Sequence, residues 1–199
     1  FTQYAYAFVQ QDADAQEDEH LEAADALRAR SRRLYLRARD YGLRGLEAAH
    51  PDFGGMLRLD RAAALGQATR EDVPLLYWTA ASWGAAVAAS KDDPDLLADL
   101  PVVEALIRRA LDLDADYDHG AIHEFLIAYE GGRSEVMGGS MDRARRHFDR
   151  AMILSEGLRA APLVGLAETV AVRSQDRAEF VSLLDRALRI DPDARPEWR

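Results

Sequence analysis

Three short segments of the chain read alike: RALDLD at residues 109–114, RAMILS at residues 150–155 and RALRID at residues 186–191. Their alanines, Ala110, Ala151 and Ala187, are 41 and then 36 residues apart, and a bulky apolar residue stands three positions before each. Stretches rich in Leu, Ala, Arg and Glu with 3.6-residue periodicity surround them, and alternating β-branched runs are absent. The chain is therefore predicted to be all-α, with a helical unit that repeats.

The repeating segment has the pattern of the second helix of a tetratricopeptide hairpin, in which small residues let neighbouring helices pack closely. Ala144, seven residues before Ala151, and Pro192, five residues after Ala187, fit this pattern. The 36-residue spacing is close to a regular repeat, whereas the 41-residue spacing needs an additional loop. We therefore expect tetratricopeptide-like helical hairpins stacked into an irregular α-solenoid, each hairpin burying its neighbour's face.

Breaker residues separate the amphipathic segments, notably HPDFGG at residues 50–55 and DDP at residues 92–94. Ser140 is expected to cap a helix, its hydroxyl accepting a backbone N–H. The expected domain organisation is an acidic, partly disordered lead-in over residues 1–18 and a single helical-repeat domain over residues 19–199. Helices are predicted at about residues 19–49, 72–90, 101–113, 120–129, 140–154, 162–172 and 176–190.

The composition excludes several classes of protein. The 199 residues are 48% hydrophobic and 30% charged, which is typical of a folded globular chain. No stretch reaches the ~20 uncharged apolar residues of a membrane span. The absence of cysteine excludes disulfides, thiolate metal sites and cysteine nucleophiles. The chain has 35 acidic and 25 basic residues, which gives a net charge of −10. We therefore do not expect it to bind nucleic acid or anionic lipid.

The additional loop is predicted at residues 129–139, YEGGRSEVMGG, where four glycines permit close backbone approach. One hypothesis is that this loop lines a ligand cleft, with Arg133 available for a bidentate pair with a carboxylate. The other is that it is a mobile surface loop with an ordinary salt bridge. The sequence leaves both hypotheses open.

Two tryptophans and a tyrosine fall on one predicted helix, in the sequence LYWTAASWG at residues 76–84. Beside small residues, Tyr77, Trp78 and Trp83 can form the wall of a cavity that holds a guest. The same side chains can equally be core residues in close helix contacts. Both interpretations agree with the spacing.

Residues that could carry catalysis or bind a metal are few. His119 and His123 lie four residues apart near a predicted helix start, with Glu124 adjacent, but no third ligand converges in the sequence. No glycine-rich phosphate loop, nucleophile elbow or paired-carboxylate signature is present. We therefore predict no catalytic residue, no metal site and no cofactor.

The first predicted helix is rich in arginine and follows an acidic stretch over residues 12–22. Its apolar stripe is expected at Leu27, Leu34, Ala38 and Tyr41. Either the arginines pair with neighbouring acids, at ~0.2–0.5 kcal/mol per pair, or they form a docking surface for an acidic partner. These arginines are Arg28, Arg30, Arg32, Arg33, Arg37, Arg39 and Arg44.

Several segments, taken in order, make the chain similar to a known family. They are LYWTAASWG at residues 76–84, HEF at 123–125, MGGSMDRARRHFDRA at 137–151 and AETVAVRSQDR at 167–177, followed by Phe180, Leu183 and Leu184. On these residues the chain resembles the T-component family of TRAP transporters (TatT), over roughly Tyr35 to Pro192. The glycine pair that leads into a helix and the Gln-Asp-Arg turn are the most specific of these features.

The resemblance implies a non-enzymatic, periplasmic protein that is usually lipid-anchored and assembles as a homotrimer. The implied partner is the substrate-binding P-component of a TRAP transporter. The implied ligand is a small organic molecule, hydrophobic ones included, held in a cleft or passage. Contact with a membrane is expected only through a lipid anchor on a cysteine upstream of Phe1, and a further helix is expected after Arg199.

The residues predicted to contact the ligand come mainly from the aromatic helix at residues 76–84 and from the loop at residues 129–139. A generic helical-repeat adaptor that binds a protein or peptide in its concave groove is the alternative. A hydrolase using His123 with Glu124 or Glu130 is a third hypothesis, for which the sequence shows no nucleophile. The predicted ligand-binding residues are Tyr77, Trp78, Trp83, Tyr129, Glu130, Arg133, Met137, Glu168 and Arg173.

Overall fold

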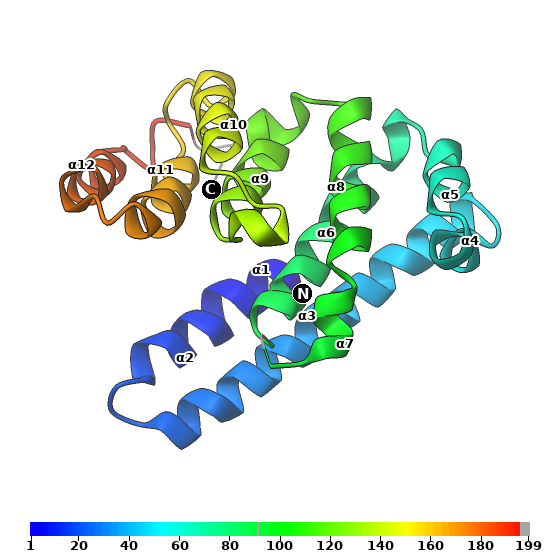
Figure 1. Ribbon diagram of the computed structural model, residues 1–199, viewed down its shortest axis with the longest axis horizontal. Helices are drawn as coiled ribbons and strands as arrows, with labels where there is room; N and C mark the ends of the chain where they lie inside the picture. The colour runs from blue at the N-terminus through cyan, green and yellow to red at the C-terminus, as the bar shows by residue number, and fades with distance from the viewer. Residues whose placement is uncertain (91, 196–199) are drawn as a thin grey trace. The chain divides into compact units, whose positions relative to one another are not determined.

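A computed structural model describes residues 1–90 and 92–195 of the chain. The prediction of an all-α fold is confirmed, since no β-strand occurs in that part of the chain (Figure 1). Contacts between Cα atoms divide the chain into two compact units, Phe1–Asp114 and Ala115–Arg199. The division falls inside the range for which the sequence predicts one domain. No helix in the described residues is both long and apolar enough to cross a membrane.

The first unit is organised around one long helix, α3. The elements of this unit are α1 (Thr2–Ala5), the π-helical segment η1 (Tyr6–Gln10), α2 (Gln11–Gln16), α3 (Leu21–Ala49), α4 (Phe53–Leu59), α5 (Arg61–Gln67), the short 3-10 helix η2 (Arg70–Asp72), α6 (Val73–Ala88), α7 (Pro94–Ala98) and α8 (Leu100–Leu113).

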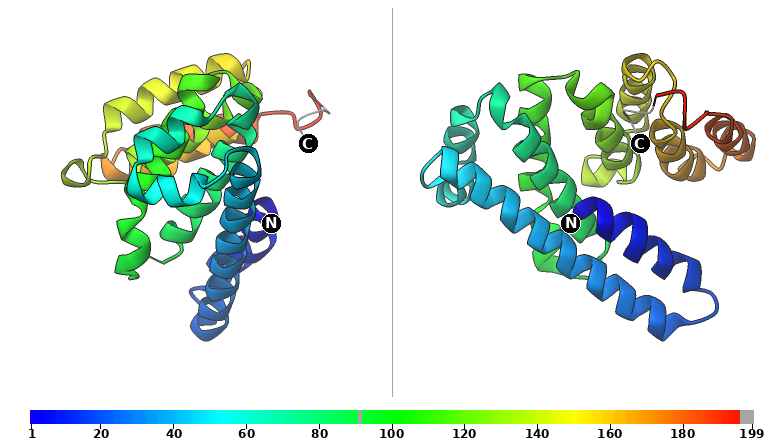
Figure 2. Two further views of the ribbon diagram at one scale, coloured as in Figure 1. Left: turned by 90° about the vertical axis from the view of Figure 1, so that its right-hand side faces the viewer. Right: turned by 180° about the vertical axis from the view of Figure 1, so that it is seen from behind.

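The N-terminal segment, expected to be a partly disordered lead-in over residues 1–18, is helical from Thr2 to Gln16. Ala5, Val9 and Ala13 are buried, and their four-residue spacing places them on one face of this segment. That face packs on α3, and Figures 1 and 2 show the segment lying along the first half of that helix. A small-residue stripe therefore orders an otherwise polar, acidic segment.

The buried face of α3 differs from the predicted one. Helix α3 carries the buried residues Ala24, Ser31, Tyr35, Gly42 and Leu46. The expected stripe at Leu27, Leu34, Ala38 and Tyr41 is only half-buried, and Tyr41 is 52% exposed. The reason is that α1, η1, α2 and α6 all pack on α3 and together bury the face that carries Tyr35 and Gly42.

Gly42 makes the close contact between α3 and α6 possible. A Cβ atom at this position would lie 2.1 Å from the Thr79 hydroxyl oxygen, closer than any real contact. Helix α6 also packs against α8, which carries the fully buried Ala110. These two helices are the first hairpin of the predicted repeat.

The two segments predicted to separate helices do so, and each also contains the start of the next helix. In HPDFGG, Asp52 takes a left-handed conformation (φ 64°) and α4 starts at Phe53. The Glu47 carboxylate accepts the backbone N–H groups of Asp52 (2.7 Å) and Gly54 (2.8 Å) at this start. In DDP, the Asp93 carboxylate caps α7, whose first residue is Pro94. Both prolines suit turns and first helical positions, where no N–H donor is needed.

The second unit consists of two further hairpins, α9 with α10 and α11–η5 with α12. Its predicted helix boundaries are confirmed to within a few residues, and Ser140 caps α10 by accepting the Arg143 N–H at 3.2 Å. The elements are the 3-10 helix η3 (Tyr117–Gly120), α9 (Ala121–Gly131), the 3-10 helix η4 (Glu135–Met137), α10 (Met141–Leu154), α11 (Ala161–Leu166), the π-helical segment η5 (Ala167–Ala171) and α12 (Arg177–Leu188).

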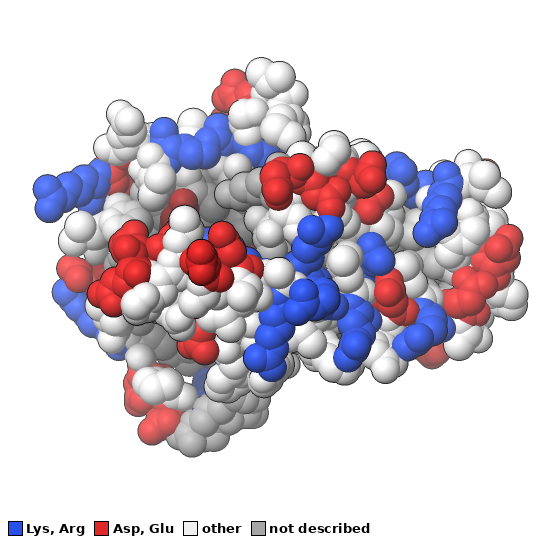
Figure 3. All heavy atoms as spheres, turned by 90° about the horizontal axis from the view of Figure 1, so that it is seen from below, with Lys and Arg blue, Asp and Glu red and all other residues white. Residues whose placement is uncertain are grey.

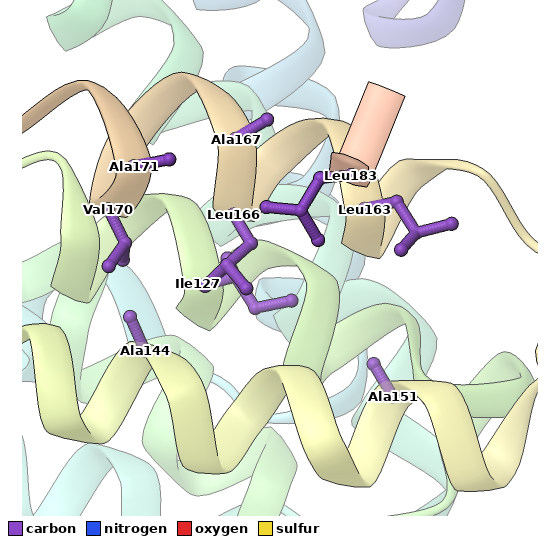
Figure 4. Packing of buried hydrophobic residues seen from close by; sticks show 9 residues of the cluster. All are labelled: Ile127, Ala144, Ala151, Leu163, Leu166, Ala167, Val170, Ala171 and Leu183. Carbon is purple, nitrogen blue, oxygen red and sulfur yellow. The ribbon is translucent and has the colours of Figure 1, made fainter. Parts of the chain in front are cut away.

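The core of this unit confirms the role predicted for the repeat alanines. Ala144 and Ala151 on α10 are fully buried and face the apolar side chains of the neighbouring helices (Figure 4). Ala187 on α12 is partly buried against the same core cluster. The cluster's other buried residues are Ile127, Leu163, Leu166, Ala167, Val170, Ala171 and Leu183.

Candidate functional site

The loop between α9 and α10 is the predicted addition to the repeat. We call residues 132–140 the glycine loop. Its tip projects two apolar side chains, with Val136 99% exposed and Met137 54% exposed. An apolar pair so exposed gains from association with another surface.

Arginine side chains hold the backbone of the glycine loop. Arg133 Nε donates to the Tyr129 carbonyl (2.9 Å) and its Nη1 donates to the Met137 carbonyl (3.1 Å). Arg173 Nη1 donates to the carbonyls of Gly131 (2.8 Å) and Arg133 (2.6 Å). Charged donors strengthen such hydrogen bonds. The loop therefore has a defined path between its two helices.

A buried carboxylate lies beneath the loop. Glu130 on α9 is fully buried, and its Oε2 accepts from Arg143 Nη2 at 2.7 Å. The same Arg143 nitrogen donates to the Gly138 carbonyl at 2.5 Å. Arg133 Nη2 lies 3.9 Å from Glu130 Oε2. Two guanidinium groups thus face the one buried anion, which offsets the cost of its desolvation.

Gly139 is where the loop comes closest to itself. A Cβ atom there would lie 2.0 Å from the Arg133 carbonyl oxygen, and the following Ser140 N–H donates to the Glu130 carbonyl at 2.9 Å. Only glycine fits this approach. The second glycine of the Gly-Gly pair is thereby explained by backbone packing.

The structure brings together most of the site residues predicted in the second unit. Tyr129, Glu130, Arg133 and Arg173 all meet at the base of the glycine loop, and the Arg133 guanidinium lies 3.6 Å from the centroid of the Tyr129 ring. Met137 lies at the tip. Glu168 is exposed on η5 and takes no part in the contacts given above. Arg143 was not among the predicted residues, because nothing in the sequence pattern marks which arginine reaches a buried acid.

The predicted aromatic residues lie on α6 in the first unit. Trp83 is 7% exposed, its Nε1 donates to Asp99 Oδ2 at 3.0 Å, and the Arg39 guanidinium stands over its ring at 4.9 Å. Tyr77 and Trp78 are half-buried and meet edge to face, with ring centroids 5.0 Å apart. Trp83 thus occupies a packed position, whereas Trp78 reaches a groove.

The groove beside Trp78 has a volume of about 310 Å³. Its walls come from α1, α3 and α6, and a hydrogen bond between the hydroxyls of Thr2 and Ser82 (2.7 Å) joins α1 to α6 at its edge. The lining is largely apolar and aromatic, which suits an apolar guest. It includes Phe1, Ala38, Tyr41, Leu75, Trp78 and Ser82.

Two histidines, His123 and His147, form a pair that the sequence did not predict, with His123 buried and His147 half-buried. His123 Nδ1 lies 2.9 Å from His147 Nδ1. Burial lowers the pKa of His123, with the nearby positive charge of Arg150 acting in the same direction. His119 lies outside the helix, in a left-handed conformation (φ 53°). Within residues 1–90 and 92–195 no group of three or more His, Asp or Glu side chains could hold a metal ion.

Glu124 is a buried carboxyl group with a shifted pKa. Burial raises its pKa to about 7, although the positive charge of Arg159 acts against this shift. Arg159 Nε lies 2.8 Å from Glu124 Oε1, and the side chain is 12% exposed. The arrangement is therefore that of a buried ion pair.

Comparison with known proteins gives two matches. The family model described as "TRAP transporter T-component" matches residues 1–199. A protein of Treponema pallidum (strain Nichols), described only as uncharacterized, is 32% identical over 202 residues. That alignment covers 98% of this chain and 62% of the relative, so the chain spans less than two thirds of the relative's length. The family match confirms the resemblance found in the sequence.

Proposed function

The chain belongs to the TRAP transporter T-component family, and from this premise we propose that it is a non-enzymatic accessory component that docks the periplasmic substrate-binding P-component. The observation that carries the proposal is the family match over residues 1–199. The family is a component of TRAP transporters. The proposal includes a periplasmic location, a lipid anchor on the full-length precursor and assembly as a homotrimer.

The tip of the glycine loop is the surface we assign to the P-component. Val136 and Met137 are exposed there, while Arg133 and Arg173 hold the backbone behind them. A segment that is already ordered loses less conformational entropy on binding. This combination of apolar exposure and a held backbone supports a docking role.

The ligand is assigned to the groove beside Trp78. A volume of about 310 Å³ falls at the lower end of the range for small-molecule sites, and its lining suits an organic, including a hydrophobic, guest. Tyr77 packs edge to face against Trp78 from the same helix, and Trp83 is retained as a proposed ligand contact. In the second unit, the proposed contacts to ligand or partner are Tyr129, Glu130, Arg133, Met137, Glu168 and Arg173.

Docking is tested by native mass spectrometry of the purified protein, alone and with the substrate-binding protein encoded beside it. We expect a complex of the two proteins. Val136→Asp should weaken it at least about tenfold by placing a charge in an apolar contact. Val181→Asp is the matched control, because Val181 is also an exposed valine (47%), on α12. If the protein does not bind this partner but binds extended peptides, the result would favour the alternative of a helical-repeat adaptor.

Ligand binding is tested by the small mass retained in the same spectra. Trp78→Ala should lose that mass, because it removes one wall of the groove. Tyr6→Ala is the control, since Tyr6 is an exposed aromatic residue (52%) that does not line the groove. Equal retention by both variants would exclude the groove as the ligand site.

A further inference from the structure

Met137 is the most exposed of the four methionines in the chain. It stands at the tip of the glycine loop, 54% exposed, beside Val136, which is 99% exposed. Charged side chains occupy much of the molecular surface seen in Figure 3, whereas this tip presents an aliphatic side chain and a thioether. The sulfur of Met137 is therefore open to small molecules in solution.

The other three methionines are half-buried and engaged in contacts. The sulfur of Met56 accepts a hydrogen bond from Gln67 Nε2 at 3.2 Å. Met141 and Met152, at the two ends of α10, pack against the buried core cluster of the second unit. Because susceptibility to oxidation follows exposure, these three sulfurs are protected relative to that of Met137.

The chain has no cysteine that would react with an oxidant first. Thiolates and thioethers are the side chains that a two-electron oxidant such as a peroxide converts most readily. Without thiols, the four thioethers are the targets of such an oxidant. The difference in exposure then directs the reaction to one of them, Met137.

The main chain at Met137 is held independently of its side chain. The Met137 N–H donates to the Ser134 carbonyl at 3.0 Å, and the Gly138 N–H donates to the Glu135 carbonyl at 2.9 Å. The Met137 carbonyl accepts from Arg133 Nη1 at 3.1 Å. Oxidation at the sulfur breaks none of these hydrogen bonds. It changes the chemistry of the loop tip and leaves the path of the loop in place.

We propose that Met137 is the oxidation site of the chain, and that its sulfoxide releases the P-component from the glycine loop. With hydrogen peroxide, a lone pair of the sulfur attacks one peroxide oxygen, the O–O bond breaks and hydroxide leaves. The proton on the transferred oxygen passes to that hydroxide, so the products are the sulfoxide and one water. The sulfur loses two electrons and the peroxide gains them. A dithiol-dependent methionine sulfoxide reductase reverses the change.

The sulfoxide opposes docking because it brings a strong hydrogen-bond acceptor into an apolar contact. In the free protein the sulfoxide oxygen is hydrated, whereas in the complex it loses that water and meets an apolar surface. The cost therefore falls on the bound state alone. By the same linkage, a docked partner protects the thioether from the oxidant. This inference rests on the proposed docking role of the loop tip.

The first measurement is the rate of oxidation at each methionine. The purified whole chain is treated with hydrogen peroxide, digested with trypsin and analysed by tandem mass spectrometry, which is needed because Met137 and Met141 share the peptide of residues 134–143. We expect Met137 to gain oxygen at least about tenfold faster than the other three. The substrate-binding protein encoded beside the chain should slow the reaction at Met137 and leave the other rates unchanged. Equal rates at all four methionines would overturn the proposal.

The second measurement is the affinity for that substrate-binding protein before and after peroxide treatment of the chain. Affinity of the wild type should fall at least about tenfold and return after treatment with the reductase, while the thermal unfolding midpoint stays the same. Met137→Leu keeps an apolar tip without a thioether, so its affinity, whatever its starting value, should not respond to peroxide. Met56→Leu is the matched control and should respond as the wild type does.

An oxidised Met137 that leaves the affinity unchanged would overturn the proposal, as would a loss of affinity that also occurs in Met137→Leu. Failure of the untreated wild type to bind this partner would overturn the proposed docking and this inference together. That outcome is recognised in the untreated sample, before any oxidant is added, so it is distinct from a failure of the oxidation step.

Discussion

Arg143 on α10 donates to the fully buried carboxylate of Glu130 on α9 at 2.7 Å, and it also donates to the Gly138 carbonyl of the glycine loop. One guanidinium therefore joins two helices and the loop between them. Because the acid is buried and the arginine is 40% exposed, the pair is asymmetric. Loss of the arginine leaves a buried anion, whereas loss of the acid leaves a cation that can reach water.

Arg143→Met should therefore destabilise the protein more than Glu130→Gln does. We expect a loss of about 2–4 kcal/mol, at or below the usual cost of breaking a buried pair, because Arg143 is partly solvated and Arg133 stays near. Urea denaturation of both single variants and the double variant checks this. If the double variant loses the sum of the two single losses, the two residues are not coupled.

Gly139→Ala should destabilise the protein by about 2 kcal/mol or more, because its Cβ atom would collide with the Arg133 backbone carbonyl. Gly66→Ala is the matched control in α5, where a Cβ atom meets nothing within 4 Å. That substitution should stabilise the helix by about 0.5–1 kcal/mol. Thermal unfolding of the two variants should show shifts of opposite sign, and equal shifts would contradict the packing described for the loop.

Glu124 should make stability fall as the pH rises. Its folded pKa of about 7 lies above the ordinary value of 4.5, so the folded state binds the proton more tightly than the unfolded state does. Between pH 4.5 and pH 7, Glu124 is ionised in the unfolded chain but still protonated in the folded protein. The free energy of unfolding therefore declines by up to about 3 kcal/mol over this range. Glu124→Gln mimics the protonated form and should remove this decline.

The measurement is the free energy of unfolding of Glu124→Gln minus that of the wild type, from pH 4 to pH 8. This difference should grow with pH and level off above pH 7. His123 acts oppositely, because its lowered pKa makes stability fall as the pH drops below 6.5, but its contribution is common to both proteins and cancels. A difference that does not change with pH would show that folding does not shift the pKa of Glu124.

Ala151→Leu should cost about 1–3 kcal/mol, because Ala151 is fully buried between α10 and its neighbours and a larger side chain has no space. Ala178→Leu is the control on the exposed side of α12, and it should change stability by less than about 0.5 kcal/mol. Chemical denaturation compares the two. Similar small effects would mean that the repeat alanines do not set the helix spacing.

The sequence predicted the long helices well because their apolar residues recur with helical spacing over many turns. It did not predict helix in residues 2–16, where the signal is only Ala5, Val9 and Ala13 among polar residues. It also read Gly54 and Gly55 as breakers, although the Glu47 carboxylate accepts the N–H groups that start α4. Such a cap depends on a side chain from the preceding helix, which a local pattern does not reveal.

For the candidate site, residue types could be predicted but their contacts could not. Arg133 was expected to pair with a carboxylate and lies 3.9 Å from Glu130 Oε2, but it also donates to the backbone carbonyls of Tyr129 and Met137, which the sequence did not indicate. Backbone carbonyls occur at every residue, so a sequence cannot show which ones an arginine will reach. The hydrogen bond of Trp83 could not be predicted either, because its acceptor Asp99 lies outside α6, the helix that carries Trp83.

The way the glycine loop is held has a consequence for its variation. The loop is held by hydrogen bonds that Arg133, Arg143 and Arg173 donate to main-chain oxygens. The side chains at residues 134–137 are all exposed, so the path of the loop does not depend on their identity. Selection can exchange those four residues without remodelling the scaffold beneath them. The same property makes the tip suitable for a combinatorial library in which new binding specificities are displayed on an unchanged frame.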